Sequence, residues 1–187
     1  MDWSDLGWTS AVRADTDAPG QTERPEPPFV LIEPLRRTAP LIFASPHSGR
    51  RYPADLLALA RTGLLSLRRS EDAFVDELFA GAAAHGACVL SATVARAYVD
   101  LNRDPNELDP DMFEERLPHA HHATSRVQAG LGAIPRITGD GQQIYRRKLA
   151  LGEAEHRMST VHRPYHAMLR GHDFGVGDPG QHVGLAV

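Results

Sequence analysis

Hydrophobic positions in the first half of the chain fall into short runs of four or five residues. Residues 29–32 (FVLI), 41–45 (LIFAS) and 88–91 (CVLS) are apolar or small and have the length of strands rather than helices. The run 41–45 ends at Pro46, which has no amide hydrogen to donate to a neighbouring strand. We therefore predict three short strands, with residues 29–32 at the edge of the sheet.

Residues 94–101 (VARAYVDL) show a different pattern, in which apolar and polar positions alternate. Arg96, Tyr98 and Asp100 fall on one side of the alternation, and apolar residues fall on the other. A period of two residues is typical of a strand. We predict a further strand here, ending in the turn-like residues 102–105.

Helical spacing is found in three other places. Residues 70–85 carry apolar side chains at every third or fourth position, and Gly86 is suited to follow the end of that helix. Residues 53–60 predict a second helix, which begins with a proline. Residues 142–169 predict one or two helices, with a kink or break at Pro164.

The order strand, helix, strand, strand favours an α/β domain over a helical bundle, and 187 residues is the length of one domain. We divide the chain into a flexible lead-in of proline and acidic residues (1–28), one α/β domain (29–170) and a glycine-rich tail (171–187). Within the domain, residues 107–136 have little periodicity and are expected to form a long loop.

Composition excludes several classes of protein. The net charge of −4 gives no general attraction to nucleic acid or to anionic membranes, and no apolar stretch has the length of a membrane span. The single cysteine, Cys88, excludes an intrachain disulfide. The N-terminus (MDWSDLGW) does not have the apolar segment of a signal peptide. We expect a cytoplasmic protein that binds a small molecule.

Three groups of polar residues follow or precede predicted elements at one end of the sheet. His47 comes directly after the strand 41–45, the acids of residues 71–72 begin the helix 70–85, and residues 102–103 follow the strand 94–101. The carboxyl ends of parallel strands lie on one side of an α/β sheet, so we expect these groups to meet there.

Those residue types suit a metal-dependent hydrolysis. A histidine and a carboxylate can hold zinc, which lowers the pKa of bound water to about 7. Arg103 has a planar fork that matches a carboxylate, and Arg96 is expected to face the same side. The combination favours hydrolysis of an amide whose substrate carries a carboxylate.

Other interpretations of these residues exist. The acids of residues 71–72 also suit the positive end of a helix and need no further role. Ser48 with His47 is a poorer candidate for a serine hydrolase, since adjacent side chains seldom point at each other. His162 and His166 lie one helical turn apart, but no His-Glu-x-x-His motif is present, and we expect them not to bind metal.

Six segments of the sequence resemble the N-formylglutamate amidohydrolase family, and they occur in the family's order. They are PHSG (46–49), SEDAFVDELF (70–79), AYVDLNRDPNE (97–107), GLGAIPR (130–136), IYRR (144–147) and RPYH (163–166).

The resemblance implies a three-layer α/β/α fold with a mixed sheet, similar to that of the zinc carboxypeptidases and incomplete at its C-terminus. It implies a metal-dependent hydrolase of amino-acid catabolism, with zinc as the expected metal. The implied reaction is cleavage of the amide of an N-formyl or N-acyl amino acid such as N-formyl-glutamate.

The resemblance also implies roles for individual residues. His47 corresponds to a metal ligand, and the acid of the Ser-Glu-Asp motif corresponds to a second one, for which we prefer Asp72 to Glu71. The residues expected to hold a substrate carboxylate are Arg96, Asn102 and Arg103.

One motif of the family has no counterpart in this chain. The family continues beyond the RPYH segment into a strand that ends in Asp-x-His-Ser and supplies a further metal-site histidine, whereas this chain has no such sequence. A third metal ligand and a general base are therefore unassigned. We expect a C-terminally truncated member, and the alternative to an active hydrolase is an inactive protein that only binds a carboxylate ligand or a partner.

Overall fold

The computed structural model describes residues 26–117, 121–171 and 184–186, which form a four-stranded sheet and several short helices. The strand order is β1-β3-β2-β4, with β1 antiparallel to β3 and with β2 parallel to both β3 and β4. The strands are β1 (Phe29–Ile32), β2 (Leu41–Ser45), β3 (Cys88–Ala92) and β4 (Gly184–Ala186).

The three strands predicted from apolar runs are confirmed, and β1 lies at the edge as expected. β4 comes from the segment that we assigned to the glycine-rich tail. Residues 1–25 of the predicted lead-in and residues 172–183 of the tail lie outside the described residues.

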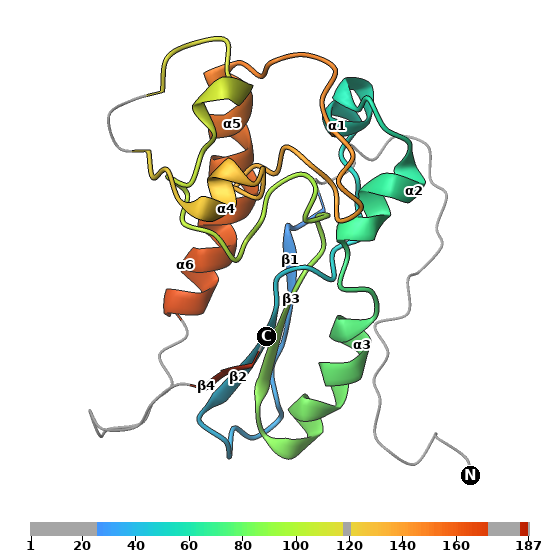
Figure 1. The fold of residues 1–187 in the computed structure, drawn as a ribbon. Coiled ribbons are helices and arrows are strands. Elements are labelled where there is room, and N and C mark those ends of the chain that lie inside the picture. Colours follow the sequence, from blue (N-terminus) through green and yellow to red (C-terminus); the bar gives the residue numbers. More distant parts are fainter. Residues whose placement is uncertain (1–25, 118–120, 172–183, 187) are drawn as a thin grey trace, which may run out of the picture.

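The helices are short and lie around the sheet (Figure 1). Their bounds are α1 (Ala54–Leu59), α2 (Leu64–Leu67), α3 (Val75–Phe79), α4 (Ser125–Gln128), α5 (Leu151–Arg157) and α6 (Arg163–Gly171). Single 3₁₀ segments follow α2 and α3, and another lies at Pro110–Met112. No helix in the described ranges combines the length and apolar character needed to cross a membrane.

α5 and α6 are joined by a π-helical segment (Met158–His162) and form one continuous helix. The predicted disturbance at Pro164 therefore takes the form of a wider turn just before the proline rather than a break. Proline has no amide hydrogen for the i→i−4 bond, and a local i→i+5 turn accommodates that loss.

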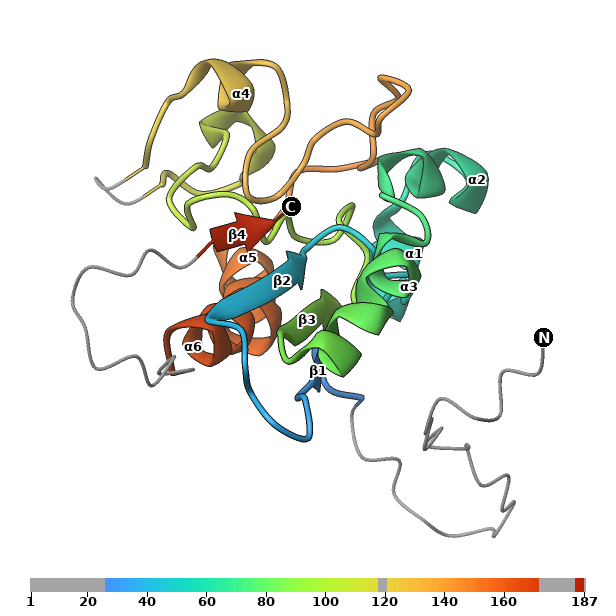
Figure 2. The same cartoon turned by 90° about the horizontal axis from the view of Figure 1, so that it is seen from below.

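Helices cover both faces of the sheet (Figure 2). Phe29 and Phe43 pair with residues of β3 that are three positions apart, so the two side chains point to opposite faces. The Phe29 ring contacts Tyr165 of α6, with 6.2 Å between centroids, and the Phe43 ring contacts Phe79 of α3 at 5.2 Å. These contacts establish a mixed α/β fold, as the sequence predicts.

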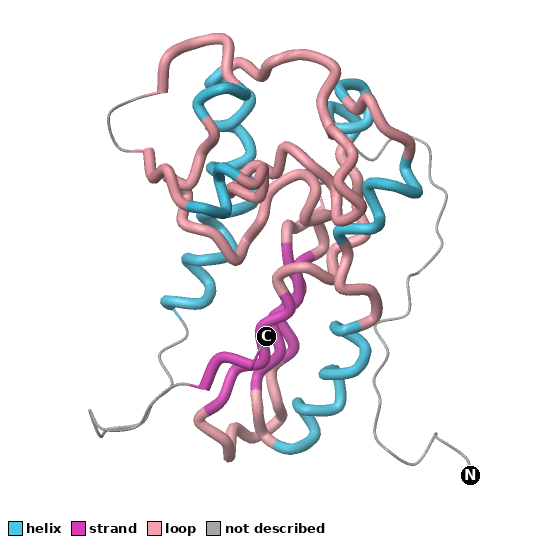
Figure 3. Tube along the Cα trace, viewed as in Figure 1, coloured by secondary structure: helices cyan, strands magenta, loops and turns pink. Residues whose placement is uncertain are grey.

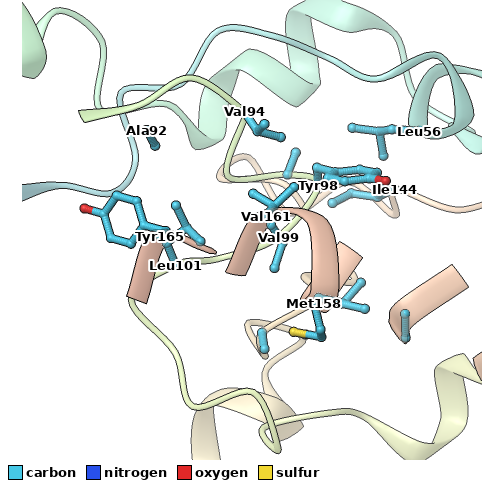
Figure 4. Packing of buried hydrophobic residues seen from close by; sticks show 14 of the residues in the cluster. Leu56, Ala92, Val94, Tyr98, Val99, Leu101, Ile144, Met158, Val161 and Tyr165 are labelled. Atoms are coloured by element: carbon cyan, nitrogen blue, oxygen red, sulfur yellow. The ribbon is translucent and has the colours of Figure 1, made fainter. Parts of the chain in front are cut away.

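Residues 94–101 do not form the predicted strand. A single isolated bridge at Val94 replaces the expected ladder, and all of these residues except Arg96 are buried. Val99, for example, lies in the core with Val161 of the α5–α6 helix (Figure 4). The prediction was wrong because alternation identifies a strand with one exposed face, and this segment is covered on nearly every side.

The predicted helix 70–85 begins later than its pattern indicates. The amide of Asp72 donates a hydrogen bond to the carbonyl of His47 (3.1 Å), which ties the start of this segment to the end of β2. Phe74 then adopts the left-handed conformation (φ 66°), and α3 begins only at Val75. A tertiary hydrogen bond therefore overrides the local preference for a first helical turn.

The described residues of the range 107–136 (107–117 and 121–136) form the expected long loop, which is interrupted by α4 and one 3₁₀ turn (Figure 3). The carbonyl of Ala133, within this loop, accepts a hydrogen bond from the amide of Asp100 (2.8 Å), which joins the loop to the segment 94–101.

Gly49 lies where the loop after β2 passes against the backbone of residues 93–94. A Cβ atom at position 49 would lie only 2.0 Å from the carbonyl oxygen of Val94, so no larger residue fits. The same crossing is held by hydrogen bonds from the amide of Arg51 to the carbonyl of Thr93 and from the amide of Ala95 to the carbonyl of Arg51, both 2.9 Å.

We expect Gly49→Ala to lower the free energy of unfolding by at least about 2 kcal/mol, because the added methyl group forces two backbone segments apart. Gly152→Ala is a matched control, since no atom lies within 4 Å of its added Cβ, and it should change stability by less than about 1 kcal/mol. Urea denaturation measures both variants. Equal stability of the two would contradict the contact at Val94.

Candidate active site

The side chain of His47 lies between two carboxylates at the end of β2. Pro46 ends the strand, the chain turns, and His47 is 4% exposed. Its Nδ1 lies 3.1 Å from Oδ2 of Asp72, and its Nε2 lies 2.7 Å from Oδ1 of Asp100. Both ring nitrogens therefore have an oxygen partner, and the ring is held in one orientation.

Of the two acids in the Ser-Glu-Asp motif, only Asp72 reaches His47. The Asp72 side chain is 47% exposed, whereas the His47 side chain is 5% exposed, so Asp72 is the solvent-facing member of the pair. The Glu71 carboxylate accepts a hydrogen bond from the Tyr52 hydroxyl, lies 3.4 Å from Arg68, and is almost fully buried. The structure thus brings Asp72 to His47, and the role of Asp72 as a metal ligand stays a prediction.

Asp100 is the buried partner of His47 and joins it to several donors. Arg96 Nε donates to its Oδ2 (3.0 Å), the amide of Asn102 donates to its Oδ1 (2.9 Å), and Arg103 Nε lies 3.8 Å away. Burial alone raises the pKa of the Asp100 carboxyl, but the hydrogen bond and charge of His47, the charge of Arg96 and the Asn102 amide outweigh burial and lower it. The carboxylate is therefore ionised at neutral pH.

The three residues predicted to bind a substrate carboxylate surround Asp100. Asn102 is exposed, and the side chain of Arg96 is 24% exposed. Arg103 is more enclosed, since Nε donates to the carbonyl of Leu131 (3.2 Å) and Nη1 donates to the carbonyl of Asn102 (2.8 Å). All three belong to one network with His47, and their contacts with a substrate stay predictions.

Ser48 has no geometry for a nucleophile paired with His47. Its hydroxyl donates to the carbonyl of Ser45 (3.3 Å), and the residue is buried. The serine-hydrolase interpretation therefore has no support in the structure.

His47 and Asp72 are placed as two ligands of one metal ion would be. Two ligands that are each ~2.0–2.1 Å from a tetrahedral ion lie about 3.3 Å apart, close to the 3.1 Å between Nδ1 and Oδ2. A carboxylate behind the other ring nitrogen, as Asp100 provides, is the usual orienting partner of a metal-bound histidine. The described part of the chain contains no group of three possible ligands, so these residues fit two positions of a metal site and the third is unassigned.

A sequence model of the N-formylglutamate amidohydrolase family matches residues 39–172, which include every site residue described above. This chain belongs to that family. The crystal structure of N-formylglutamate amidohydrolase from Ralstonia eutropha JMP134 is 36% identical to it, with a TM-score of 0.71, and the similarity covers 76% of this chain and 50% of that one. The chain therefore spans about half the length of that neighbour. No curated protein matches it.

Sequence reasoning missed Asp100, although it belongs to the segment that most closely resembles the N-formylglutamate amidohydrolases. The residue begins the Asp-Leu-Asn-Arg run and shares one side of the alternating pattern with Arg96. An acid that lies between Arg96 and Arg103, two residues before Asn102, was the available signal.

His166, the last residue of the family segment RPYH, and His162, which directly precedes that segment, contact the backbone of the same run. His162 Nε2 donates to the carbonyl of Arg103, and His166 Nε2 donates to the carbonyl of Leu101, both at 2.9 Å. The two rings stack with 4.3 Å between centroids. They therefore bind backbone carbonyls and contact each other.

Burial lowers the pKa of both histidines. For His162, burial outweighs the hydrogen bond to the Arg103 carbonyl and the charges of Asp104 and Asp100, which raise the pKa, and the charge of Arg163 lowers it further. For His166, burial and the charges of His162 and Arg170 lower the pKa, and together they outweigh the hydrogen bond to the Leu101 carbonyl, which raises it. Both rings are consequently biased toward the neutral form.

We expect the free energy of unfolding to fall as the pH is lowered from about 7 through the pKa values of these two histidines. Their pKa in the unfolded chain is about 6.5, so below that pH the unfolded state binds more protons than the folded state. Denaturant unfolding between pH 5 and 7.5 should show a steeper dependence in the wild type than in the variant His162→Gln with His166→Gln. Identical pH dependence of the two proteins would contradict the assignment.

Proposed function

We propose that this chain is a metal-dependent amidohydrolase that cleaves an N-formyl or N-acyl amino acid such as N-formyl-glutamate. Membership of the family supports an amidohydrolase activity in general. The observation that carries the specific proposal is the placement of His47 between Asp72 and Asp100, in one network with two arginines. We also propose that the sheet and its two helical layers correspond to a zinc-carboxypeptidase-like arrangement.

His47 Nδ1 and the Asp72 carboxylate would hold a zinc ion, and Asp100, by accepting from Nε2, would keep the imidazole in the tautomer that leaves Nδ1 unprotonated. Zinc, when bound, polarises a carbonyl and lowers the pKa of water to about 7. The exposed side of Asp72 provides the direction from which a substrate approaches.

The arginines account for the choice of substrate. Hydrogen bonds within the described residues use Nε and Nη1 of Arg103 and Nε of Arg96, so Nη2 of each remains for a carboxylate. Asn102, exposed beside them, supplies an amide that can donate to the same group. A guanidinium group is positively charged and its planar fork matches a carboxylate, which favours an acidic, planar group over a neutral one.

Zinc affinity tests the metal site without requiring turnover. In calorimetric titrations with zinc chloride, His47→Ala and Asp72→Ala should bind at least about 100-fold more weakly than the wild type, since each removes a ligand. Asp100→Asn should bind about 10–100-fold more weakly, because it removes the orienting partner.

Asp76→Asn is the matched control, since Asp76 is an acid of α3 whose carboxylate is held by Arg50 at 2.7–2.8 Å. It should retain wild-type zinc affinity. Wild-type affinity in His47→Ala would exclude this metal site. Zinc binding without hydrolysis of N-formyl-glutamate would leave the protein as a carboxylate-binding member of the family.

Arg103→Ala should raise KM for N-formyl-glutamate by at least about tenfold in the zinc-loaded protein, because a hydrogen bond to a charged group contributes roughly 1.5–3 kcal/mol. KM for the substrate with its carboxylates blocked as amides should be unchanged. Arg50→Ala, which removes a surface arginine paired with Asp76 and Glu77, is the control. An equal rise in KM for blocked and unblocked substrates would exclude a carboxylate contact.

A further inference from the structure

Asn102 is held through its backbone on every side. Its amide donates to Asp100 Oδ1 (2.9 Å), and its carbonyl accepts from Arg103 Nη1 (2.8 Å). The carbonyls directly before and after it accept from His166 and His162 of the α5–α6 helix. The exposed Asn102 side chain thus lies on a stretch of backbone that four hydrogen bonds hold in place.

Both histidines act as hydrogen-bond donors to these backbone carbonyls. A carbonyl oxygen only accepts, so Nε2 of His162 and of His166 must carry the hydrogen. Both Nε2 atoms are therefore occupied by these carbonyls. The lowered pKa of each ring keeps the stacked pair neutral near pH 7, which avoids placing two like charges 4.3 Å apart.

A third contact comes from the same helix. Arg157, which is fully buried, donates through Nη1 to the carbonyl of Tyr98 (3.1 Å), and its guanidinium lies over the Tyr98 ring with 4.3 Å to the centroid. The α5–α6 helix therefore contacts both ends of the segment 98–103, at Tyr98 and at Arg103. These contacts take the place of a neighbouring strand, because buried backbone carbonyls need a donor.

We propose that His162 and His166 are positioning residues that fix the turn carrying Asn102 and Arg103, and so determine how tightly a substrate carboxylate is bound. This inference rests on the proposed function of that turn. Neither histidine contacts the substrate in it, since both act through backbone carbonyls. The expected signature is an effect on KM with little effect on kcat.

Three kinds of variant separate this role from general stability. His162→Leu and His166→Leu remove the donor, whereas His162→Gln and His166→Gln keep an N–H group at a similar distance from the backbone. His156→Leu is the control, because His156 lies on the exposed side of the same helix.

In the zinc-loaded protein, each leucine variant should raise KM for N-formyl-glutamate about tenfold and leave kcat within about twofold. The glutamine variants and His156→Leu should keep the wild-type KM. Amide hydrogen exchange in peptides covering residues 98–105 should become faster in the leucine variants only.

The inference is overturned if the leucine variants match His156→Leu in both KM and exchange. If a leucine variant fails to fold, a raised KM in a folded glutamine variant overturns the inference, because the donor is still present there.

If the zinc-loaded wild type hydrolyses nothing, the proposed function fails, and hydrogen exchange of residues 98–105 then decides the positioning role separately. Faster exchange in the leucine variants supports it, and unchanged exchange excludes it.

Discussion

The buried carboxylate of Asp100 is the constraint on which the site depends. An ionised carboxylate with almost no exposed surface is strongly destabilising unless cations and hydrogen-bond donors surround it. In this protein those partners are His47 from the end of β2, two arginines from its own segment, and the amide of Asn102. Satisfying one buried charge therefore brings together the residues that the proposed chemistry requires.

A second constraint acts on the backbone around Asp100. The segment enters the core without joining the sheet, so its carbonyls must find donors elsewhere. Side chains of the α5–α6 helix supply them. The helix is consequently coupled to the candidate site although it contributes no side chain to the proposed metal or carboxylate contacts.

The sequence pattern correctly predicted the strands β1, β2 and β3, whose apolar runs can be recognised without knowledge of the rest of the fold. The apolar runs of β1, β2 and β3 and the placement of His47 at a strand end follow from neighbouring residues, whereas its approach to Asp72 was expected from the topology of a parallel sheet. The segment 94–101 was misassigned because alternation does not reveal that both sides are covered. The start of α3 was misplaced because a backbone hydrogen bond from Asp72 to β2 forms only in the folded chain. Asp100 was overlooked because its burial and its contact with the distant His47 form only in the folded chain.

The π-helical segment between α5 and α6 restricts how this region can change in length. A regular helix rotates about 100° per residue, so side chains five positions apart point about 140° away from each other. The wider turn at Met158–His162 reduces that angle and lets Arg157 and His162 face the same segment. Insertion or deletion of one residue here would rotate one half of the helix relative to the other. Either the hydrogen bond from Arg157 or those from His162 and His166 to the segment 98–103 would then be broken. Substitutions on the solvent side are therefore tolerated more readily than any change in residue count between Arg157 and His162.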